Sequence, residues 1–368
     1  MQTLSFFAWL YWNPPLEAFR VPLIDRPVVW YGVLFVCGFV IGYFLFATIL
    51  SDYFKKNTFV SRLDVYNWSK LIRSLQTELK NPDSFFSQVQ DLDIKRNLEN
   101  IDHNSVHEEN KKTILRYLNF LISSKITDRQ LLPVQLAGLS STQQTAYLLT
   151  DRLLWFVVLG TVVGARLGHV FFYDWDLFKH HPLEIFKVWK GGLASHGGVI
   201  GVFIALYLFY LSIKDNFPHF SFLRLLDFVA IPSALAGCFI RLGNFMNQEI
   251  VGTPSQLPWA IVFGNAADGS LPIPRHPVQL YEAAAYLLTF LVLYSLWKTK
   301  KYEENPGLFV GLLFILVFGA RFILEFWKVH QESVFETASL QAGQLLSIPF
   351  IFIGVFWVYL SQRNSQSI

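Results

Sequence analysis

The chain has 368 residues, of which 53% are hydrophobic and 17% aromatic, and its mean hydropathy is +0.36. A water-soluble domain of this length would be less apolar, so the composition excludes an ordinary soluble protein. The formal net charge is only +3 and the basic residues are dispersed, which argues against a nucleic-acid-binding surface.

Seven apolar runs of about 20 residues follow one another along the chain, and each is long enough to cross ~30 Å of hydrocarbon as a helix. They cover residues 28–50, 153–173, 193–212, 225–241, 278–297, 307–326 and 343–360. The stretch before the first run is rich in aromatic residues but lacks a basic region and a cleavage site, which favours an interfacial segment over a removable signal peptide. The sequence therefore predicts an all-α polytopic membrane protein with about seven transmembrane helices.

We expect three parts. Residues 1–51 form the N-terminal interfacial segment and first transmembrane helix, residues 52–152 a polar insertion, and residues 153–368 a six-helix transmembrane catalytic core. The insertion carries 14 Lys or Arg and 12 Asp or Glu, with apolar residues at helical spacing, so we expect a helical soluble domain. His103 and His107 have the i, i+4 spacing of metal ligands, but no third ligand is nearby, and an exposed helical face is the preferred interpretation.

Basic residues that flank the spans predict the orientation. Six of them fall on one side of a seven-span chain: Lys55, Lys56, Arg152, Lys298, Lys300 and Lys301. Three others, Lys179, Lys187 and Lys190, argue the opposite way. We expect the insertion and the C-terminus in the cytoplasm and the N-terminus outside.

With that orientation, uncommon polar side chains of six spans reach one leaflet. They are Tyr31; Arg166, His169 and Tyr173; His196; Arg241, Asn244 and Glu249; Arg275, His276, Gln279, Tyr281 and Glu282; and Arg321 and Glu325. Taken singly, each has a structural explanation. The arginines could be anchors at the membrane interface, and the tyrosines could belong to the aromatic belt at the membrane surface. Arg321 and Glu325 could form a structural ion pair, and His196 could be a core histidine. Their coincidence on one face predicts a functional site, since polar groups in a membrane segment are costly.

The residue types at this face indicate the ligand. An arginine guanidinium can donate two hydrogen bonds to the oxygens of one phosphate. His196 can accept or donate a proton near neutral pH. Glycines around His196 leave room for close approach: Gly191, Gly192, Gly197 and Gly198. Cys37 and Cys238 lie in apolar runs and are interpreted as buried hydrophobic residues. With no metal-ligand cluster, nucleotide loop or nucleophile elbow in the sequence, we predict a site for an anionic phospholipid with one candidate base and no nucleophile of its own.

The stretch 241–252, RLGNFMNQEIVG, resembles the signature of the prolipoprotein diacylglyceryl transferases. Four further blocks are similar to those of this family and stand in its order: GARLGHVFFY (164–173), GGLASHGGVIG (191–201), RHPVQLYE (275–282) and ARFILEF (320–326). The resemblance covers residues 28–50 and 153–360. It departs from the family pattern at Ile240, where glycine is usual, and at His169 and Val317, where tyrosine is usual. The insertion is far longer than the family's usual cytoplasmic loop.

The resemblance implies transfer of the diacylglyceryl group from phosphatidylglycerol to the lipobox cysteine thiol of a preprolipoprotein, in the bacterial cytoplasmic (inner) membrane. A thioether forms and glycerol phosphate leaves. The implied catalytic residues are His196, Arg241 and Arg321, with His196 either the general base or a headgroup ligand. The implied phosphatidylglycerol-binding residues are Tyr31, Tyr173, Gly197, Arg241, Asn244, Glu249, Gly252, Arg321 and Glu325, the last orienting Arg321. The partners are phosphatidylglycerol, the lipobox segment and membrane lipids, with no cofactor, metal or nucleic acid.

Two other functions are compatible with a membrane protein that binds an anion. A transporter predicts inverted repeats and polar groups near the membrane midplane, and neither is seen in the sequence. A non-catalytic lipid-binding scaffold would suit the changes at His169, Ile240 and Val317. His196, Arg241 and Arg321 nevertheless remain in place, which favours the enzyme.

Overall fold

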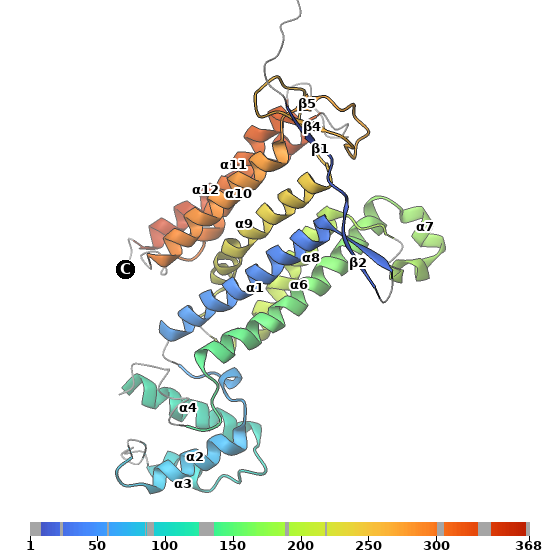
Figure 1. Cartoon of the computed structure of the whole chain (residues 1–368). Helices are drawn as coiled ribbons and strands as arrows, with labels where there is room; N and C mark the ends of the chain where they lie inside the picture. Colours follow the sequence, from blue (N-terminus) through green and yellow to red (C-terminus); the bar gives the residue numbers. More distant parts are fainter. Residues whose placement is uncertain are drawn as a thin grey trace, which may run out of the picture. The chain divides into compact units, whose positions relative to one another are not determined.

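The computed structural model describes residues 9–22, 25–56, 59–84, 86, 92–124, 136–187, 191–217, 219–299, 305–329 and 340–365 (Figure 1). Among the residues used above for orientation, Lys190, Lys300 and Lys301 lie outside these ranges, as do the first eight residues of the predicted interfacial segment.

Seven helices in the described ranges are long and apolar enough to cross a membrane, which confirms the predicted all-α polytopic fold. They are α1 (Trp30–Lys56), α6 (Thr142–Phe172), α8 (Ser195–Ile213), α9 (Phe222–Met246), α10 (Val278–Lys298), α11 (Leu308–Leu324) and α12 (Ala342–Ser365). Helix α6 begins well before the apolar run at residue 153. The cause is a capping box, in which Ser141 Oγ accepts from Gln144 N and Gln144 Oε1 accepts from Ser141 N.

The chain divides into two compact units, and each is described by itself. The first comprises Met1–Phe46 and Leu223–Ile368, and the second comprises Ala47–Phe222. The three-part division by sequence position stays a prediction.

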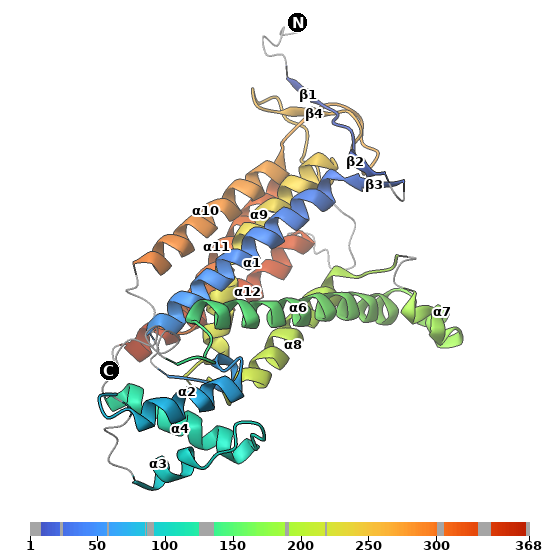
Figure 2. The ribbon, with the colours of Figure 1, turned by 60° about the horizontal axis from the view of Figure 1, so that its bottom comes forward.

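The first unit combines membrane helices with two small sheets in its connecting segments. Strands β1 (Leu10–Trp12), β4 (Ile261–Phe263) and β5 (Pro274–Arg275) form one sheet, in which β1 is parallel to β4 and β4 antiparallel to β5. Strands β2 (Glu17–Val21) and β3 (Arg26–Val29) form an antiparallel hairpin beyond the N-terminal end of α1 (Figure 2). These short strands were not expected from the sequence, because they lie outside the apolar runs.

Asp227 is fully buried within α9 and caps another membrane helix. Its carboxylate accepts hydrogen bonds from the backbone N–H of Gly307 at 2.7 Å and of Val310 at 3.0 Å. These N–H groups belong to the first turn of α11, which has no intrahelical acceptors for them. The one acidic residue of the fourth apolar run is therefore a helix cap.

In the second unit, α6 and α8 approach so closely that their backbones touch. Gly160, Gly164 and Gly168 on α6 face Gly197 and Gly201 on α8, and a methyl group on Gly164 would lie 2.7 Å from Gly201 Cα. Small residues four apart are the usual means of such contact in membranes, where close packing rather than hydrophobic burial holds helices together. Along the chain, α6 and α8 are connected by a segment that contains α7 (Trp175–His180) and the 3-10 turn η3 (Pro182–Phe186).

The insertion is helical, as expected, and has a hydrophobic core of its own. It contains η1 (Arg62–Asp64), α2 (Trp68–Lys80), α3 (Leu92–Glu99) and α4 (Glu108–Ser124). Buried aliphatic side chains from α2 and α4 surround Tyr117, whose hydroxyl donates to Phe86 O at 3.0 Å. Burial raises the pKa of Tyr117 to about 12, so the phenol stays neutral.

A β-bridge and a buried hydrogen bond connect the insertion to the start of α6. Val65 pairs with Leu139, and Thr145 Oγ1 donates to the buried Asp64 Oδ1 at 2.6 Å. Gly138 makes the β-bridge possible: its φ is +108°, and a Cβ there would lie 2.5 Å from Leu71 N.

We predict that Gly138→Ala destabilises the insertion by about 2–4 kcal/mol, because it adds left-handed strain and a clash with backbone atoms. Hydrogen exchange of the α2 and α4 amides in the full chain measures this. Gly269→Ala is the control, since Gly269 has a φ of +70° but no atom within 4 Å of the added methyl. Unchanged exchange in α2 and α4 of Gly138→Ala would contradict the assignment.

Candidate active site

Arg241 lies near the end of α9, and acidic and polar neighbours fix its guanidinium. Its Nε is 3.1 Å from Glu282 Oε2, and its Nη1 donates to Asn244 Oδ1 at 3.2 Å. The group also lies over the ring of Tyr286, 5.9 Å from the ring centre. The Arg241 side chain is 14% exposed, so these partners replace most of its water. The structure thus brings Arg241 and Asn244 together, as predicted.

Glu249 occupies a tight turn directly after α9. Its carboxylate accepts from Asn244 Nδ2 at 2.7 Å and from Asn247 Nδ2 at 3.0 Å, while its backbone oxygen accepts from Gln279 Nε2 at 2.6 Å. The flanking Gln248 and Ile250 have φ values of 54° and 55°. Such left-handed backbone in residues other than glycine persists only where the surroundings fix it, and it is concentrated at functional sites.

Tyr31, at the start of α1, joins the same cluster. Its ring packs on Gly243, where an added methyl would lie 2.8 Å from Tyr31 Cδ2. Tyr31 is also within electrostatic range of both Glu249 and Arg241. The first unit therefore gathers a phenol, an arginine and a carboxylate at one end of its helices.

Glu282 and Lys328 complete the cluster. Glu282 was expected at this face without an assigned function, whereas Lys328 was not predicted. Lys328 Nζ is 2.9 Å from Glu282 Oε1 and 2.9 Å from Glu325 Oε2. The side chains of Lys328 and Glu282 are 8% and 0% exposed. Glu282 therefore bridges two buried cations, Arg241 and Lys328. Lys328 resembles an ordinary flanking lysine, and the signal for it was the unmatched acidic residue of the RHPVQLYE block.

The proposed orientation of Arg321 by Glu325 stays a prediction, because within the described residues 305–329 no ion pair joins the two side chains. Glu325 pairs with Lys328 instead. Glu325 still has helical dihedrals, and its N–H donates to Arg321 O, but it also begins the 3-10 turn η5 (Glu325–Trp327). Residues three apart share one face of such a turn, which brings the Glu325 carboxylate to Lys328. The Glu325 carboxylate packs against Gly343 of α12. Arg321 lies within electrostatic range of Tyr286, the ring that Arg241 also contacts.

Gly252 acts through its backbone. Its N–H donates to His276 O at 3.2 Å, it pairs with Lys328, and its own oxygen accepts from Arg275 Nη1 at 3.2 Å. A side chain there would meet His276, with its Cβ 2.7 Å from His276 Cβ. Burial lowers the pKa of His276, so the imidazole is neutral at neutral pH and its Nδ1 faces the Tyr281 hydroxyl at 3.3 Å. Gly252 thus allows the chain segment that carries Lys328 to lie beside the site.

His196, Tyr173 and Gly197 belong to the second unit. His196 is exposed in the first turn of α8. Tyr173 is 63% exposed at the end of α6 and stacks on His169, with ring centres 5.8 Å apart. His169 in turn pairs with Asp174, with Nε2 2.8 Å from Oδ2.

Arg166 is not the interfacial anchor that its position suggests. It is 6% exposed, and it donates to the backbone oxygens of Ile185 at 2.9 Å, Glu184 at 2.6 Å, Gly191 at 2.8 Å and Gly192 at 3.1 Å. All of these bonds lie within the segment that precedes His196. Arg166 therefore fixes the approach to α8 and has a structural function.

Within the ranges that the structure describes, no group of three or more His, Cys, Asp or Glu side chains is placed to hold a metal ion.

Gly197, expected to give a ligand room, is occupied by helix packing. We predict that Gly197→Ala lowers the free energy of unfolding by about 1–3 kcal/mol without any lipid, because its methyl would lie 2.6 Å from Gly168 Cα. Gly198→Ala is the matched control, since its nearest neighbour is 3.6 Å away. Denaturation in mixed detergent micelles measures both. Equal stability of the two variants, with weaker lipid binding by Gly197→Ala, would restore the binding interpretation.

We predict that Glu282→Gln lowers the free energy of unfolding by about 3–5 kcal/mol, because two buried cations lose their shared counter-charge. The same denaturation measures it. Glu17→Gln is the control in the same unit: Glu17 pairs with Arg20 at the exposed surface, and its loss should have no measurable effect. A Glu282→Gln variant as stable as this control would show that the bridge contributes nothing.

Comparisons with known proteins agree with the motifs. The family model described as prolipoprotein diacylglyceryl transferase matches residues 119–360. A Protochlamydia amoebophila protein named phosphatidylglycerol–prolipoprotein diacylglyceryl transferase is 49% identical, over 99% of this chain and 98% of its own length. Proteins of the same name from Tolumonas auensis (46%) and Chlamydia pneumoniae (42%) align with 58% and 54% of this chain and 80% and 70% of their own lengths. The chain belongs to the prolipoprotein diacylglyceryl transferase family.

Proposed function

We propose that this protein transfers the diacylglyceryl group of phosphatidylglycerol to the lipobox cysteine of a preprolipoprotein. The names of its relatives support the two substrates. The observation that carries the proposal in the structure is the guanidinium of Arg241, buried and oriented by Glu282 and Asn244.

The reaction is a displacement at carbon. The cysteine thiolate attacks the glyceryl carbon that bears the phosphate, a C–S bond forms, and the C–O bond to phosphate breaks. Glycerol phosphate leaves with the bonding electron pair. Since negative charge grows on the phosphate oxygens, cations fixed beforehand at that place lower the barrier.

Arg241 and Arg321 are the cations proposed for the phosphate. Glu282 Oε2 lies 3.1 Å from Nε of Arg241 as an ion pair without hydrogen-bond geometry, and Asn244 accepts from Nη1. Nη2 of Arg241 is the group proposed to donate to phosphate oxygens. Arg321 shares the Tyr286 surroundings of Arg241. Two arginines can together bind several oxygens of one phosphate.

The neutral polar residues are proposed to bind the glycerol of the headgroup. Asn244, Glu249 and Tyr31 offer amide, carboxylate and phenol groups for hydroxyls, and Tyr173 offers an exposed aromatic surface. Glu325 pairs with Lys328, and Gly252 acts through its backbone.

His196 is proposed as the base that takes the thiol proton. Its exposure at the start of α8 makes it accessible. A hydrogen bond from His196 to the headgroup would use the same residue, so the experiment below separates the two functions.

The protein is a multi-pass membrane protein. We propose that the reaction takes place at the outer face of the cytoplasmic (inner) membrane, with the insertion and C-terminus in the cytoplasm. Lys55, Lys56 and Arg152 support this orientation.

The test is a coupled assay with purified protein, phosphatidylglycerol and a lipobox peptide, in which the release of glycerol phosphate is measured. We predict release that requires the peptide cysteine and falls about 10²–10³-fold in Arg241→Ala. Arg20→Ala, at the exposed Glu17 pair, is the control and should retain activity. Normal release by Arg241→Ala would refute the phosphate assignment.

Two substitutions at His196 separate its possible functions. His196→Gln keeps hydrogen bonding but cannot take a proton in this range, and His196→Ala does neither. If His196 is the base, both variants lose activity. Activity in the Gln variant alone would assign it to headgroup binding. Lipid binding without any release, in every variant and in the native chain, would favour a non-catalytic binder.

A further inference from the structure

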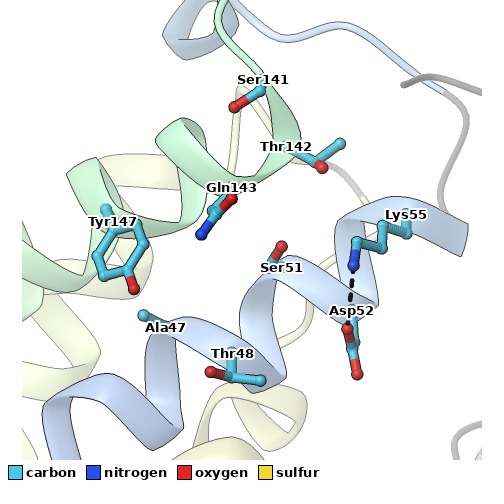
Figure 3. A pocket seen from close by; sticks show the side chains of 9 residues that line it. All are labelled: Ala47, Thr48, Ser51, Asp52, Lys55, Ser141, Thr142, Gln143 and Tyr147. Carbon is cyan, nitrogen blue, oxygen red and sulfur yellow. Dashed lines mark ion pairs between the residues drawn. The ribbon is translucent and has the colours of Figure 1, made fainter. Parts of the chain in front are cut away.

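A polar cavity lies in the second unit, where α1 ends and α6 begins (Figure 3). Its volume is about 430 Å³. Hydroxyl, amide and charged side chains line most of it, among them Ser51, Asp52 and Lys55 from α1 and Thr142 and Gln143 from α6. None of these residues is among those proposed above for the transfer reaction. Pockets of this size commonly hold small ligands.

Two largely buried residues of this cavity carry hydroxyl groups that open on it and lack a protein partner in the described part of the chain. Ser51 is 7% exposed and Thr142 is 4% exposed, and neither side chain makes a hydrogen bond to another described residue. Ser51 points from α1 toward α6, and the Gln143 amide points from α6 toward α1 (Figure 3). These hydroxyl and amide groups are therefore available to bond a polar ligand between the two helices.

The α6 side of the cavity favours a phosphate. Ser141 caps the N–H of Gln144, while the N–H groups of Thr142 and Gln143, in the first turn, have no intrahelical acceptor. The positive end of the helix dipole and these free N–H groups make a helix N-terminus a site for anions. Lys55 Nζ adds a full positive charge from α1.

The α1 side of the cavity adds a negative group, which further restricts the class of ligand that would fit. Asp52 Oδ1 is 3.6 Å from Lys55 Nζ, too far for a hydrogen bond, so both groups keep bonding capacity. The lining carries one positive and one negative side chain. A ligand that joins a phosphate to an ammonium matches both, whereas a purely anionic ligand would face the Asp52 carboxylate.

The position of the cavity along the membrane helices favours a lipid. Ser51 directly follows Leu50, the last residue of the first apolar run, and Lys55 and Lys56 end the helix. Charged residues at such a boundary lie at the level of the lipid headgroups.

We propose that this cavity binds the phosphoethanolamine headgroup of a zwitterionic phospholipid. Lys55 and the start of α6 hold the phosphate, Asp52 accepts from the ammonium, and Ser51 and Thr142 bond the remaining oxygens.

The test is binding of short-chain phosphatidylethanolamine to the full-length protein in detergent, followed by native mass spectrometry. Lys55→Gln should weaken binding at least ~10-fold, because a charged hydrogen bond is lost. Lys56→Gln is the matched control: it removes the neighbouring charge, which does not line the cavity, and should bind normally. Ser51→Ala is a second, milder variant and should also weaken binding. Glycerol phosphate release by each variant shows that its fold is intact.

Three further ligands test the chemistry. Phosphatidylcholine should bind more weakly than phosphatidylethanolamine, because its quaternary ammonium has no N–H to donate to Asp52, and Asp52→Asn should remove this preference. Soluble glycerophosphoethanolamine separates the two sources of the headgroup: equal binding indicates a soluble ligand, and weaker binding indicates a membrane lipid, and both support the site. Binding that is equal in Lys55→Gln, Ser51→Ala and Lys56→Gln, or as strong for phosphatidylglycerol as for phosphatidylethanolamine, would overturn the proposal.

Discussion

The site of the first unit depends on one buried carboxylate, that of Glu282. It bridges Arg241 and Lys328, and without it two cations would lie in surroundings that exclude most water. Neighbouring features fit this requirement. The backbone pairing at Gly252 places Lys328 beside α10, and Glu325 gives Lys328 a second partner. Burying these charges is costly, and the arrangement fits the proposal that Arg241 presents its guanidinium in one fixed orientation to a phosphate.

In the second unit, His196 lies at the start of α8, where its own side chain is exposed. Contacts between the glycine-lined faces of α6 and α8 set the helix position, because backbone atoms meet there. Arg166 fixes the segment before α8 through four carbonyl oxygens. His196 itself stays exposed. This arrangement fits the proposal that His196 contacts a large substrate, because its position is set by residues that leave its side chain accessible.

The sequence predicted the seven spans because each is a long apolar run, and it predicted the grouping of Tyr31, Arg241 and Glu249 because such residues are costly in a membrane. Which charges pair could not be predicted. The pairing of Glu325 with Lys328 depends on where α11 gives way to a 3-10 turn, and the buried state of Lys328 depends on a backbone bridge to Gly252. Composition also cannot separate a glycine that gives a ligand room from one whose missing side chain lets another helix pack closely, as at Gly197.

The central claim is that Glu282 acts by orienting Arg241 for phosphate. A double-mutant cycle with phosphatidylglycerol affinity as the measured quantity tests it most directly, comparing Arg241→Gln, Glu282→Gln and the double variant with the native chain. If the claim holds, each single change weakens binding and the double variant binds about as well as Arg241→Gln alone, because Glu282 has nothing left to orient. Losses that add in the double variant would show that Glu282 and Arg241 contribute independently, and would contradict the claim.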